Sequence, residues 1–449
     1  MTAPKTTSTG ILATMFSAVR ALQLYPAEND VVITTAAVPG KKAPVLVTAD
    51  FVDPKPHPAV NTTTLDALAD QLVAAGITRV DGDIVGDSTA ALSYPEVPKH
   101  LVVIGAGAAC WFWQLRSGLT ITGLSRDVVW GFYIAQFTFL VGVAASAVMG
   151  VLPYYLHNYK AFGKMTILGE FLAIAAVIMC MSFIFVDMGR PDRIMNVFLH
   201  PTAHSMMFWD TVALSGYLVL NILISRVSLS AERRGEAPPK WIKPIIILSI
   251  PWAVSIHTVT AFLYSGLSAR PFWMTAILAP RFLASAFAAG PALLILLALI
   301  VRKLTNFDPG KEAIQKLAEI VTYAMLLNVF FVAMELFTAL YSDIPEHVHH
   351  FQFLFMGLEG NNTLAPWMWL SLVLAVVALV ILVNPATRRA ETTLVVGCVA
   401  VFGSLWIDKG LGMVIAGFVP SPLGKVTHYA PTAPELTISL AIYAAGILI

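Results

Sequence analysis

Charged residues are scarce in this sequence. Only 12% of the 449 residues are charged and 57% are hydrophobic, whereas about 25% of the residues of a soluble domain are charged. The mean hydropathy of +0.75 excludes an ordinary soluble protein. The net charge of +1 gives no general attraction to nucleic acid. We therefore predict an all-α, multi-pass membrane protein that lies in a lipid bilayer and has no nucleic-acid partner.

Patterns that bind metals or haem are also scarce. Cys110, Cys180 and Cys398 lie in apolar segments without CxxC spacing, which argues against an iron–sulfur cluster in this chain. His257 is the only histidine deep within an apolar run, whereas a membrane b-haem needs histidines that face one another. The HVHH stretch at 347–350 lies in a predicted loop, where a surface or interface role is expected. The sequence therefore predicts no metal, haem or iron–sulfur group of its own.

Residues 1–97 differ from the rest of the chain. They are polar and rich in Pro and Thr, and no run among them is long and apolar enough to span a bilayer. The stretch TTTLDALADQLVAAGITRVDGDIVGDS at 62–88 resembles part of the D-alanyl-D-alanine carboxypeptidases, but the Ser-x-x-Lys and Lys-Thr-Gly motifs of that family are missing. We predict an inactive fragment or fusion at 1–97 and a membrane domain at 98–449.

Ten apolar runs follow, each near the roughly 20 residues that a bilayer requires. The first run is short and rich in glycine. The predicted spans are 101–116, 128–152, 165–186, 205–226, 242–265, 277–301, 320–341, 366–383, 391–408 and 434–449.

Lys and Arg are unevenly divided between the two sets of connections. Connections after even-numbered spans hold thirteen of them, and connections after odd-numbered spans hold seven, including Lys409 and Lys425. The positive-inside rule therefore places the even-numbered connections in the cytoplasm. Gly, Pro and aromatic residues give the outer connections the character of loops that fold over a site or under a partner. These outer connections are 118–131, 189–210, 263–273, 342–362 and 407–432.

Most ionisable side chains inside the spans lie toward this outer side. Asp187 and Asp210 occupy outer ends, and His257, Tyr264 and Glu335 occupy outer halves of their spans. A charged group at membrane depth costs about 2.5–3.5 kcal/mol, so such groups normally face one another or a polar cavity. The pattern predicts a polar pocket that opens toward the outer face, with hydrogen bonding between helices as the alternative.

The stretch at 187–210 (DMGRPDRIMNVFLHPTAHSMMFWD) is polar for a connection between two spans. Arg190 and Asp192 flank Pro191, so a stiffened turn offers both bidentate donors and an acceptor. A salt-bridged helix end is the alternative interpretation.

Four stretches of the sequence resemble the polysulfide reductase NrfD-like family of membrane subunits. They are SRDVVWGFYIAQFTFLVGVAASAVM, the stretch at 187–210, IHTVTAFLYSGLSARPFWMTAILAPRFLASAFAAGPAL and DKGLGMVIAGFVPSPLGKVTHYAPT. The resemblance covers about residues 115–446. Within the family, these stretches are most similar to the DsrP-type subunits of DsrMKJOP sulfite-reduction complexes and to HmeB-type subunits.

The resemblance implies a pair of four-helix bundles with flanking helices in the inner (cytoplasmic) membrane. It also implies a site near the outer face for menaquinone or another quinone as the bound substrate. The implied partners are an outer-side, ferredoxin-like iron–sulfur subunit and further haem-containing membrane and multihaem cytochrome subunits. The chain would then be the quinone-reactive subunit of an oxidoreductase of dissimilatory sulfur metabolism, and not catalytic alone.

The candidate site residues combine residue type with predicted depth. We expect Asp187 and His257 to hydrogen-bond the quinone oxygens or to move protons. Arginines would orient the head group and tryptophans would wall the cleft. Glu170 and Glu335 are candidates for a proton path toward the cytoplasm. The residues expected to bind quinone are Arg190, Asp192, Trp209, Asp210, Tyr264, Arg270 and Trp273.

Two other functions stay open at this stage. A secondary transporter would show broken helices and charges at the membrane midplane, whereas the ionisable groups here gather in the outer half. A structural anchor would have the same fold without quinone chemistry.

Overall fold

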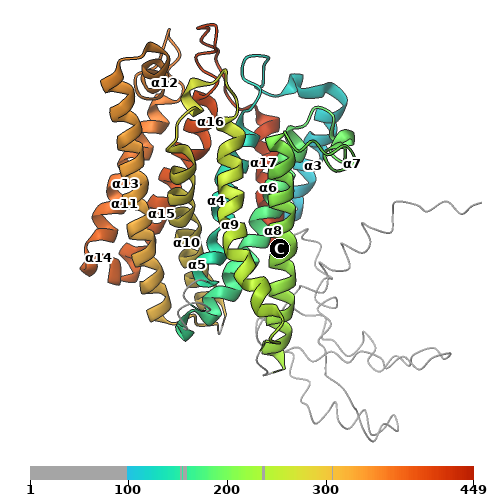
Figure 1. Ribbon diagram of the computed structural model, residues 1–449, viewed down its shortest axis with the longest axis vertical. Helices are drawn as coiled ribbons and strands as arrows, with labels where there is room; N and C mark the ends of the chain where they lie inside the picture. The colour runs from blue at the N-terminus through green and yellow to red at the C-terminus, as the bar shows by residue number, and fades with distance from the viewer. Residues whose placement is uncertain (1–98, 152–153, 155–158, 235–237, 306) are drawn as a thin grey trace, which may run out of the picture. The chain divides into compact units, whose positions relative to one another are not determined.

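The computed structural model describes residues 99–449 except 152–153, 155–158, 235–237 and 306 (Figure 1). The chain divides into two units, Met1–Lys99 and His100–Ile449. The predicted N-terminal segment, with its carboxypeptidase-like stretch, lies outside the described residues.

The described part of the chain is helical, with one isolated bridge of extended backbone between Leu358 and Asn361. Eight helical segments are long and apolar enough to span a bilayer, which confirms the all-α membrane fold. Helices α3 (Lys99–Ser117) and α17 (Ala433–Leu448) occupy the first and last predicted spans. The eight segments are α4 (Phe132–Ala144) with α5 (Ser146–Val151), α6 (Gly163–Asp187), α8 (Met206–Arg233), α9 (Ile242–Ser265), α10 (Leu278–Leu304), α11 (Lys311–Ser342), α13 (Ala365–Val383), and α15 (Glu391–Leu405) continued by η8 (Trp406–Gly412) and α16 (Met413–Ala416).

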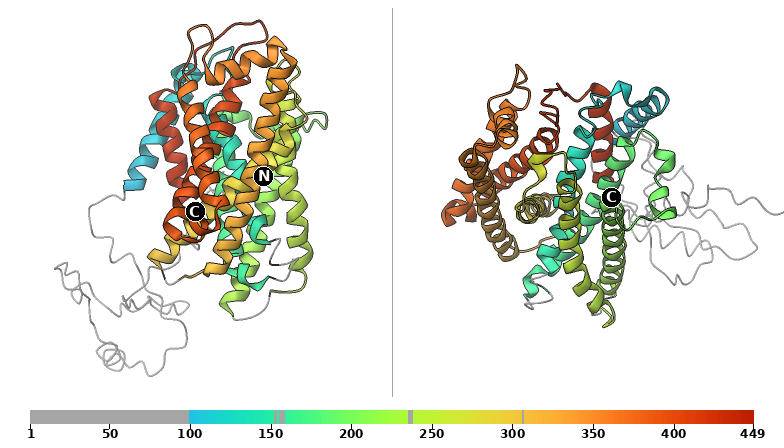
Figure 2. Two further views of the ribbon diagram at one scale, coloured as in Figure 1. Left: turned by 90° about the vertical axis from the view of Figure 1, so that its left-hand side faces the viewer. Right: turned by 45° about the horizontal axis from the view of Figure 1, so that its top comes forward.

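The spans form two rings of four helices. In the first bundle, α4 packs on α6, α6 on α8, α8 on α9, and α9 returns to α4. In the second bundle, α10 packs on α11, α11 on α13, α13 on α15, and α15 returns to α10. Helix α17 lies on α4 and α6, and α3 lies beside α17, with Gly107 against Ala441 (Figure 2). The predicted pair of four-helix bundles with flanking helices is therefore confirmed.

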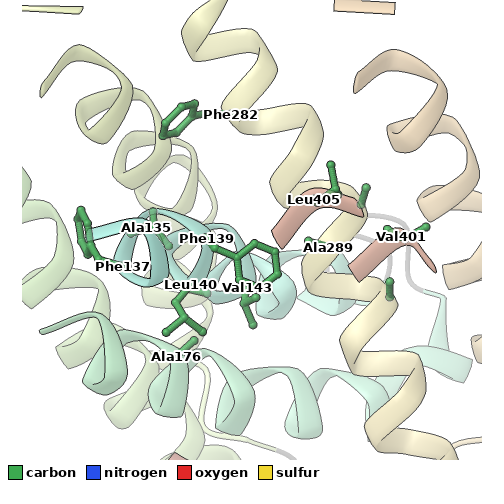
Figure 3. Close-up of a cluster of buried hydrophobic side chains, with 14 of the residues drawn as sticks. Ala135, Phe137, Phe139, Leu140, Val143, Ala176, Phe282, Ala289, Val401 and Leu405 are labelled. Carbon is green, nitrogen blue, oxygen red and sulfur yellow. The ribbon is translucent and has the colours of Figure 1, made fainter. Parts of the chain in front are cut away.

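Small residues allow the two bundles to approach closely. A Cβ atom at Gly290 of α10 would lie 3.2 Å from the carbonyl oxygen of Val143 on α4. A Cβ atom at Gly142 would lie 3.5 Å from the Cα atom of Ala286. Such close backbone approach is typical of helix packing in membranes. Apolar side chains of α4, α6, α10 and α15, among them Phe139 and Leu140, fill the space around this contact (Figure 3).

The five predicted outer connections lie together at one end of the bundles, toward the top in Figure 1. We call this the outer end and the opposite end the inner end. Short helices order these connections: η3 (Gly118–Ile121), η6 (Pro191–Arg193), α7 (Asn196–Leu199), η7 (Pro271–Trp273) and α12 (Pro345–Phe355). The HVHH stretch lies on α12, so its assignment to a loop was wrong; a proline at the start of the helix sets this boundary.

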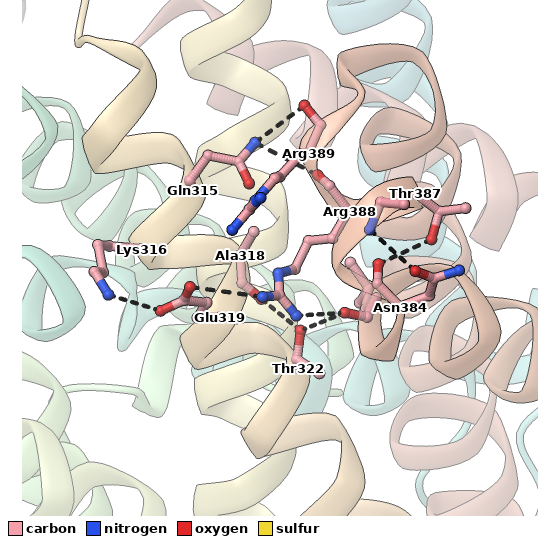
Figure 4. A network of polar contacts seen from close by, with 11 residues as sticks. Gln315, Lys316, Ala318, Glu319, Thr322, Asn384, Thr387, Arg388 and Arg389 are labelled. Atoms are coloured by element: carbon pink, nitrogen blue, oxygen red, sulfur yellow. Dashed lines mark hydrogen bonds and ion pairs between the residues drawn. The ribbon is translucent and has the colours of Figure 1, made fainter.

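The inner end of the second bundle is closed by a polar network around α14 (Pro385–Arg389) (Figure 4). Arg388 donates to the Leu382 carbonyl at 2.8 Å and pairs with Glu319 of α11 at 3.5 Å. Gln315 of α11 donates to the carbonyl oxygens of Arg388 and Arg389. These contacts attach the connection between α13 and α15 to α11.

The ninth span is longer than predicted, because helical structure continues from Glu391 through Ala416. Lys409 was placed in an outer connection, and this placement was wrong: the residue lies in η8 and is only 4% exposed. Removing it from the count leaves six Lys and Arg in the outer connections against thirteen at the inner end. The correction strengthens the assignment of the inner end to the cytoplasm.

Candidate functional site

Polar side chains are buried near the outer end of the first bundle. Asp210, at the start of α8, accepts a hydrogen bond from Thr260 Oγ1 of α9 at 2.6 Å. His257 lies one turn before Thr260 and is fully buried, and among the described residues neither of its ring nitrogens has a hydrogen-bond partner. A buried polar group without a partner is costly. His257 is therefore a candidate to hydrogen-bond a ligand.

Tyr264 continues this face of α9 toward the outer end. Its hydroxyl shares a hydrogen bond of 2.5 Å with Thr138 Oγ1 of α4. The rings of Trp130, Trp273 and Phe282 surround it at centroid distances of 4.9–6.0 Å. The indole of Trp273 is held by a hydrogen bond from Nε1 to the Met413 carbonyl at 2.9 Å. The result is a phenol hydroxyl inside an aromatic enclosure.

Asp187 ends α6 beside a second group of polar side chains. Its Oδ1 is buried, and no hydrogen-bond partner for it lies in the part of the chain that the structure describes. Nearby, the Tyr133 hydroxyl donates to Gln114 Oε1 at 2.8 Å, and Gln114 Nε2 donates to the Val186 carbonyl at 2.6 Å. Glu435 of α17 lies within electrostatic range of Asp187. Asp187 of the first bundle and Glu435 of the flanking helix α17 thus lie near each other at the outer end.

Glu435 also joins distant parts of the chain, and it was missed in the sequence. Its Oε2 accepts hydrogen bonds from the backbone N–H groups of Gly123 and Thr432, both at 2.8 Å. The Tyr429 hydroxyl donates to its Oε1 at 3.0 Å. Burial, with Glu435 alongside, raises the pKa of Tyr429 well above its usual range, so this hydroxyl stays protonated. The capping box Thr432-x-x-Glu435 was the available signal.

Arg190, Asp192 and Trp209 lie at the surface of the outer end and not among the buried groups. The Arg190 guanidinium donates to both carboxylate oxygens of Asp192, at 3.0 and 3.1 Å, and holds the pKa of Asp192 below its usual value. These two side chains are 66% and 59% exposed. Trp209 is 45% exposed and donates to the Ala203 carbonyl.

Arg270 and Trp273 come from one connection but have different surroundings. The guanidinium of half-buried Arg270 lies 4.4 Å from the centroid of the Phe418 ring. Trp273 is fully buried and contacts Trp130 and Tyr264. Trp273 therefore belongs to the buried aromatic group, whereas Arg270 contacts Gly417 and Phe418 in the 407–432 connection.

The two glutamates of the predicted proton path lie in different bundles, each with its own partner. Glu170 of α6 accepts a hydrogen bond from Ser225 Oγ at 3.3 Å, while its Oε1 has no partner within the described ranges. Glu335 of α11 pairs with Arg281 of α10. Arg281 also donates to both oxygens of Asp408 in η8, at 2.8 Å. Sequence reasoning missed this ion-paired group, although an arginine inside an apolar run was a visible signal.

His350 on α12 has a structural role in the described residues. Because carbonyl oxygens only accept, Nδ1 carries the hydrogen and donates to Ala416 at 2.6 Å and to Val419 at 3.1 Å. Its ring packs on Phe272, and burial lowers the pKa of His350 to about 4. Among the residues that the structure describes, no group of three His, Cys, Asp or Glu side chains is arranged to hold a metal.

Two cavities, of about 440 and 370 Å³, lie at the inner end, away from these groups. Arg226 and Trp241 line the first, and Lys311 and Arg389 line the second. Their basic lining agrees with a cytoplasmic surface.

Residues 120–418 match the family model described as polysulphide reductase, NrfD. Residues 5–60 match the C-terminal domain of alanine dehydrogenase/PNT, and this shorter match lies outside the described part of the chain.

Three curated proteins are similar to this chain over much of its length. A putative membrane subunit of a dimethyl sulfoxide reductase of Halobacterium salinarum is 28% identical, over 78% of this chain and 87% of that protein. The Hdr-like menaquinol oxidoreductase integral membrane subunit of Archaeoglobus fulgidus is 24% identical, over 64% of this chain and 71% of that protein. A subunit of the selenate reductase of Mesobacillus selenatarsenatis is 21% identical, over 54% and 64% respectively.

Proposed function

Because this chain belongs to the polysulphide reductase NrfD family, we propose that it is the membrane subunit of a respiratory electron-transfer complex that oxidises or reduces a quinone near its outer face. The similar proteins are by name subunits of two reductases and of a menaquinol oxidoreductase. Menaquinone or a related quinone is the proposed substrate. Dissimilatory sulfur metabolism is the proposed setting, and the inner (cytoplasmic) membrane is the proposed location.

The observation that carries this proposal is the imidazole of His257, which lacks a hydrogen-bond partner among the described residues and lies two helical turns before Tyr264 and its aromatic enclosure on α9. A quinone head group is flat and apolar, and its two oxygens need hydrogen bonds and protons when it is reduced. Trp130 and Trp273 offer flat apolar walls, and His257 offers two free ring nitrogens in the same region of the first bundle. This combination fits a quinone head group better than a purely structural role.

Each buried polar group has a proposed task. His257 holds or releases a proton at a ring nitrogen and hydrogen-bonds one quinone oxygen. Asp187 exchanges a proton at Oδ1, its free carboxylate oxygen. Asp210 fixes Thr260 on the same turn of α9 as His257, and the Tyr264 hydroxyl is a further donor. Trp130 and Trp273 exclude water from the head group.

The partner that exchanges electrons is proposed to bind on the outer connections. An iron–sulfur subunit of ferredoxin-like type would dock there, with haem-containing membrane and multihaem cytochrome subunits completing the complex. The support is a surface that combines the charged pair of Arg190 and Asp192 with exposed apolar side chains, which is typical of interfaces. These apolar side chains include Phe198, Leu199 and Met207.

Turnover of the purified complex tests the proposal. The complex is given a water-soluble menaquinol analogue or the corresponding quinone, and electron transfer to or from the partner is followed. We expect His257→Gln and Asp187→Asn to lower turnover by about 100-fold or more while the complex stays assembled. His349→Gln, at an exposed position on α12, is the matched control. Unchanged turnover in both site variants would instead identify the chain as a structural anchor.

A further inference from the structure

Lys409 is buried between the two bundles without an acidic partner. In the described part of the chain, its Nζ donates to one carbonyl, that of Phe282, at 3.4 Å. The same Nζ lies 4.4 Å from the centroid of the Phe282 ring. No described carboxylate forms an ion pair with it, and it is the one lysine among the buried polar residues. A lysine so placed is unusual, because a buried ammonium normally has a counterion.

The acids next to Lys409 are already engaged by another cation. Arg281 binds both oxygens of Asp408 and also binds Glu335. With both carboxylates ionised and Lys409 neutral, this group of four side chains carries one negative charge inside the membrane. One added proton makes the group neutral. The arrangement therefore has room for one exchangeable proton.

Lys409 also adjoins the candidate quinone site. The ring of Phe282, which contacts Lys409 Nζ, packs against the ring of Tyr264 at a centroid distance of 6.0 Å. A Cβ atom at Gly142 of α4 would lie 3.1 Å from Nζ, so the glycine leaves the space that the amine occupies. Cys180 of α6 and His257 of α9 lie within electrostatic range of Lys409. The ionisable groups facing Lys409 thus come from both bundles.

The local backbone explains how two consecutive charged residues both face the interior. Residues 406–412 (WIDKGLG) form a π-helical turn, which is wider than an α-helical turn and frequently occurs at functional sites. A Cβ atom at Gly410 would lie 3.2 Å from the Ala135 carbonyl, so glycine allows this wide turn to lie against α4.

We propose that Lys409 exchanges a proton between the quinone site of the first bundle and the Arg281–Glu335–Asp408 group of the second. The proposal rests on the proposed quinone chemistry. When the quinol is oxidised, its O–H bonds break and two electrons pass to the iron–sulfur partner. His257 takes up one of the two released protons, and the free carboxylate oxygen of Asp187 takes up the other. The N–H bond of protonated His257 then breaks as an N–H bond forms at the Lys409 amine. Lys409 next gives this proton to a carboxylate of Asp408 or Glu335 and returns to the neutral amine.

Two substitutions separate proton exchange from charge balance. Lys409→Met removes the proton-binding nitrogen, whereas Lys409→Arg places a permanent cation there that does not release its proton at neutral pH. Proton exchange requires that both variants lower the quinol-oxidation rate of the assembled complex by about 10-fold or more, with little change in KM. Lys316→Met, an exposed lysine paired with Glu319, is the control and is expected to turn over like the wild type.

The outcomes distinguish this proposal from the proposed function. A Lys409→Arg variant that turns over at the wild-type rate would overturn the proposal and leave quinone chemistry intact. A wild-type complex that turns over no quinol analogue would instead overturn the proposed function. If the variants do not assemble, a measurement on the wild-type complex still tests the proposal. With ¹⁵N-labelled lysine, infrared difference spectra should show a change in lysine protonation when quinol is added. Spectra without this change would also contradict the proposal.

Discussion

Buried ionisable residues differ between the two bundles in whether they form ion pairs. In the first bundle, Glu170, Asp210 and His257 each lack an oppositely charged partner among the residues that the structure describes. In the second bundle, Arg281 binds two carboxylates at once. The first arrangement leaves proton-binding atoms available to a ligand, whereas the second uses them to join three helices. We infer that the quinone binds in the first bundle, whereas the ion-paired group of the second bundle joins its helices and accepts the proton that Lys409 passes on.

The largest expected effect concerns Arg281 in the ion-paired group of the second bundle. Arg281→Met leaves Glu335 and Asp408 buried without a cation, which should lower the free energy of unfolding by about 3–5 kcal/mol. Thermal unfolding of the purified complex measures this loss. Arg302→Met is the matched control, because Arg302 lies on the same helix in a partly exposed pair with Glu391 and should cost less than about 1 kcal/mol. Equal stability of the two variants would contradict the proposed role of the pair.

The second-largest expected effect concerns Asp210 in the first bundle. Asp210→Asn keeps the shape and can still accept the hydrogen bond from Thr260, so assembly and stability should change little. Turnover should fall by about 10- to 100-fold, because the amide does not exchange a proton as a carboxylate does. Asp192→Asn, at an exposed position, is the control. If Asp210→Asn destabilises the complex without a specific loss of turnover, Asp210 joins helices as Arg281 does.

A pH effect is expected at the outer end of the second bundle. The pKa of His350 is about 4 in the folded protein, against roughly 6.5 when unfolded. Stability is therefore complete above pH 6.5 and falls as the pH drops toward 4, by roughly 2 kcal/mol at pH 5. Hydrogen exchange of residues 417–432 at pH 7 and pH 5 measures the change. His350→Gln does not titrate, so persistence of the full pH effect in this variant would assign it to another group.

The smallest effect concerns Arg190 and Asp192. As an exposed ion pair, they should contribute less than about 1 kcal/mol to stability in a double-mutant cycle. Arg190→Gln should change quinol turnover less than threefold once the iron–sulfur partner is bound. A tenfold loss under that condition would place the pair in the quinone site, as the sequence motif suggested, and would extend the site from the buried group to the surface.

The spans were predictable because apolar length follows directly from bilayer thickness. The predicted ninth span ended at residue 408, because hydropathy places the adjacent charges of Asp408 and Lys409 in a loop. The partner of Asp408 is Arg281, which lies 127 positions away in sequence. The contacts of Lys409 are with Phe282, on the same helix as Arg281. His257 could be found because a lone histidine inside an apolar run is itself a signal. Glu435 could not be assigned to the outer end of the first bundle, because its partner Gly123 lies 312 positions away.

The contact between Glu435 and Gly123 has a consequence for how the protein is made. Helix α17 packs on α4 and α6, yet the ribosome completes it only after all eight spans have been synthesised. Until then, the N–H group of Gly123 lacks its acceptor, and α4 and α6 remain uncovered on one side. The first bundle to be translated is therefore covered by α17 only after the second bundle has been translated.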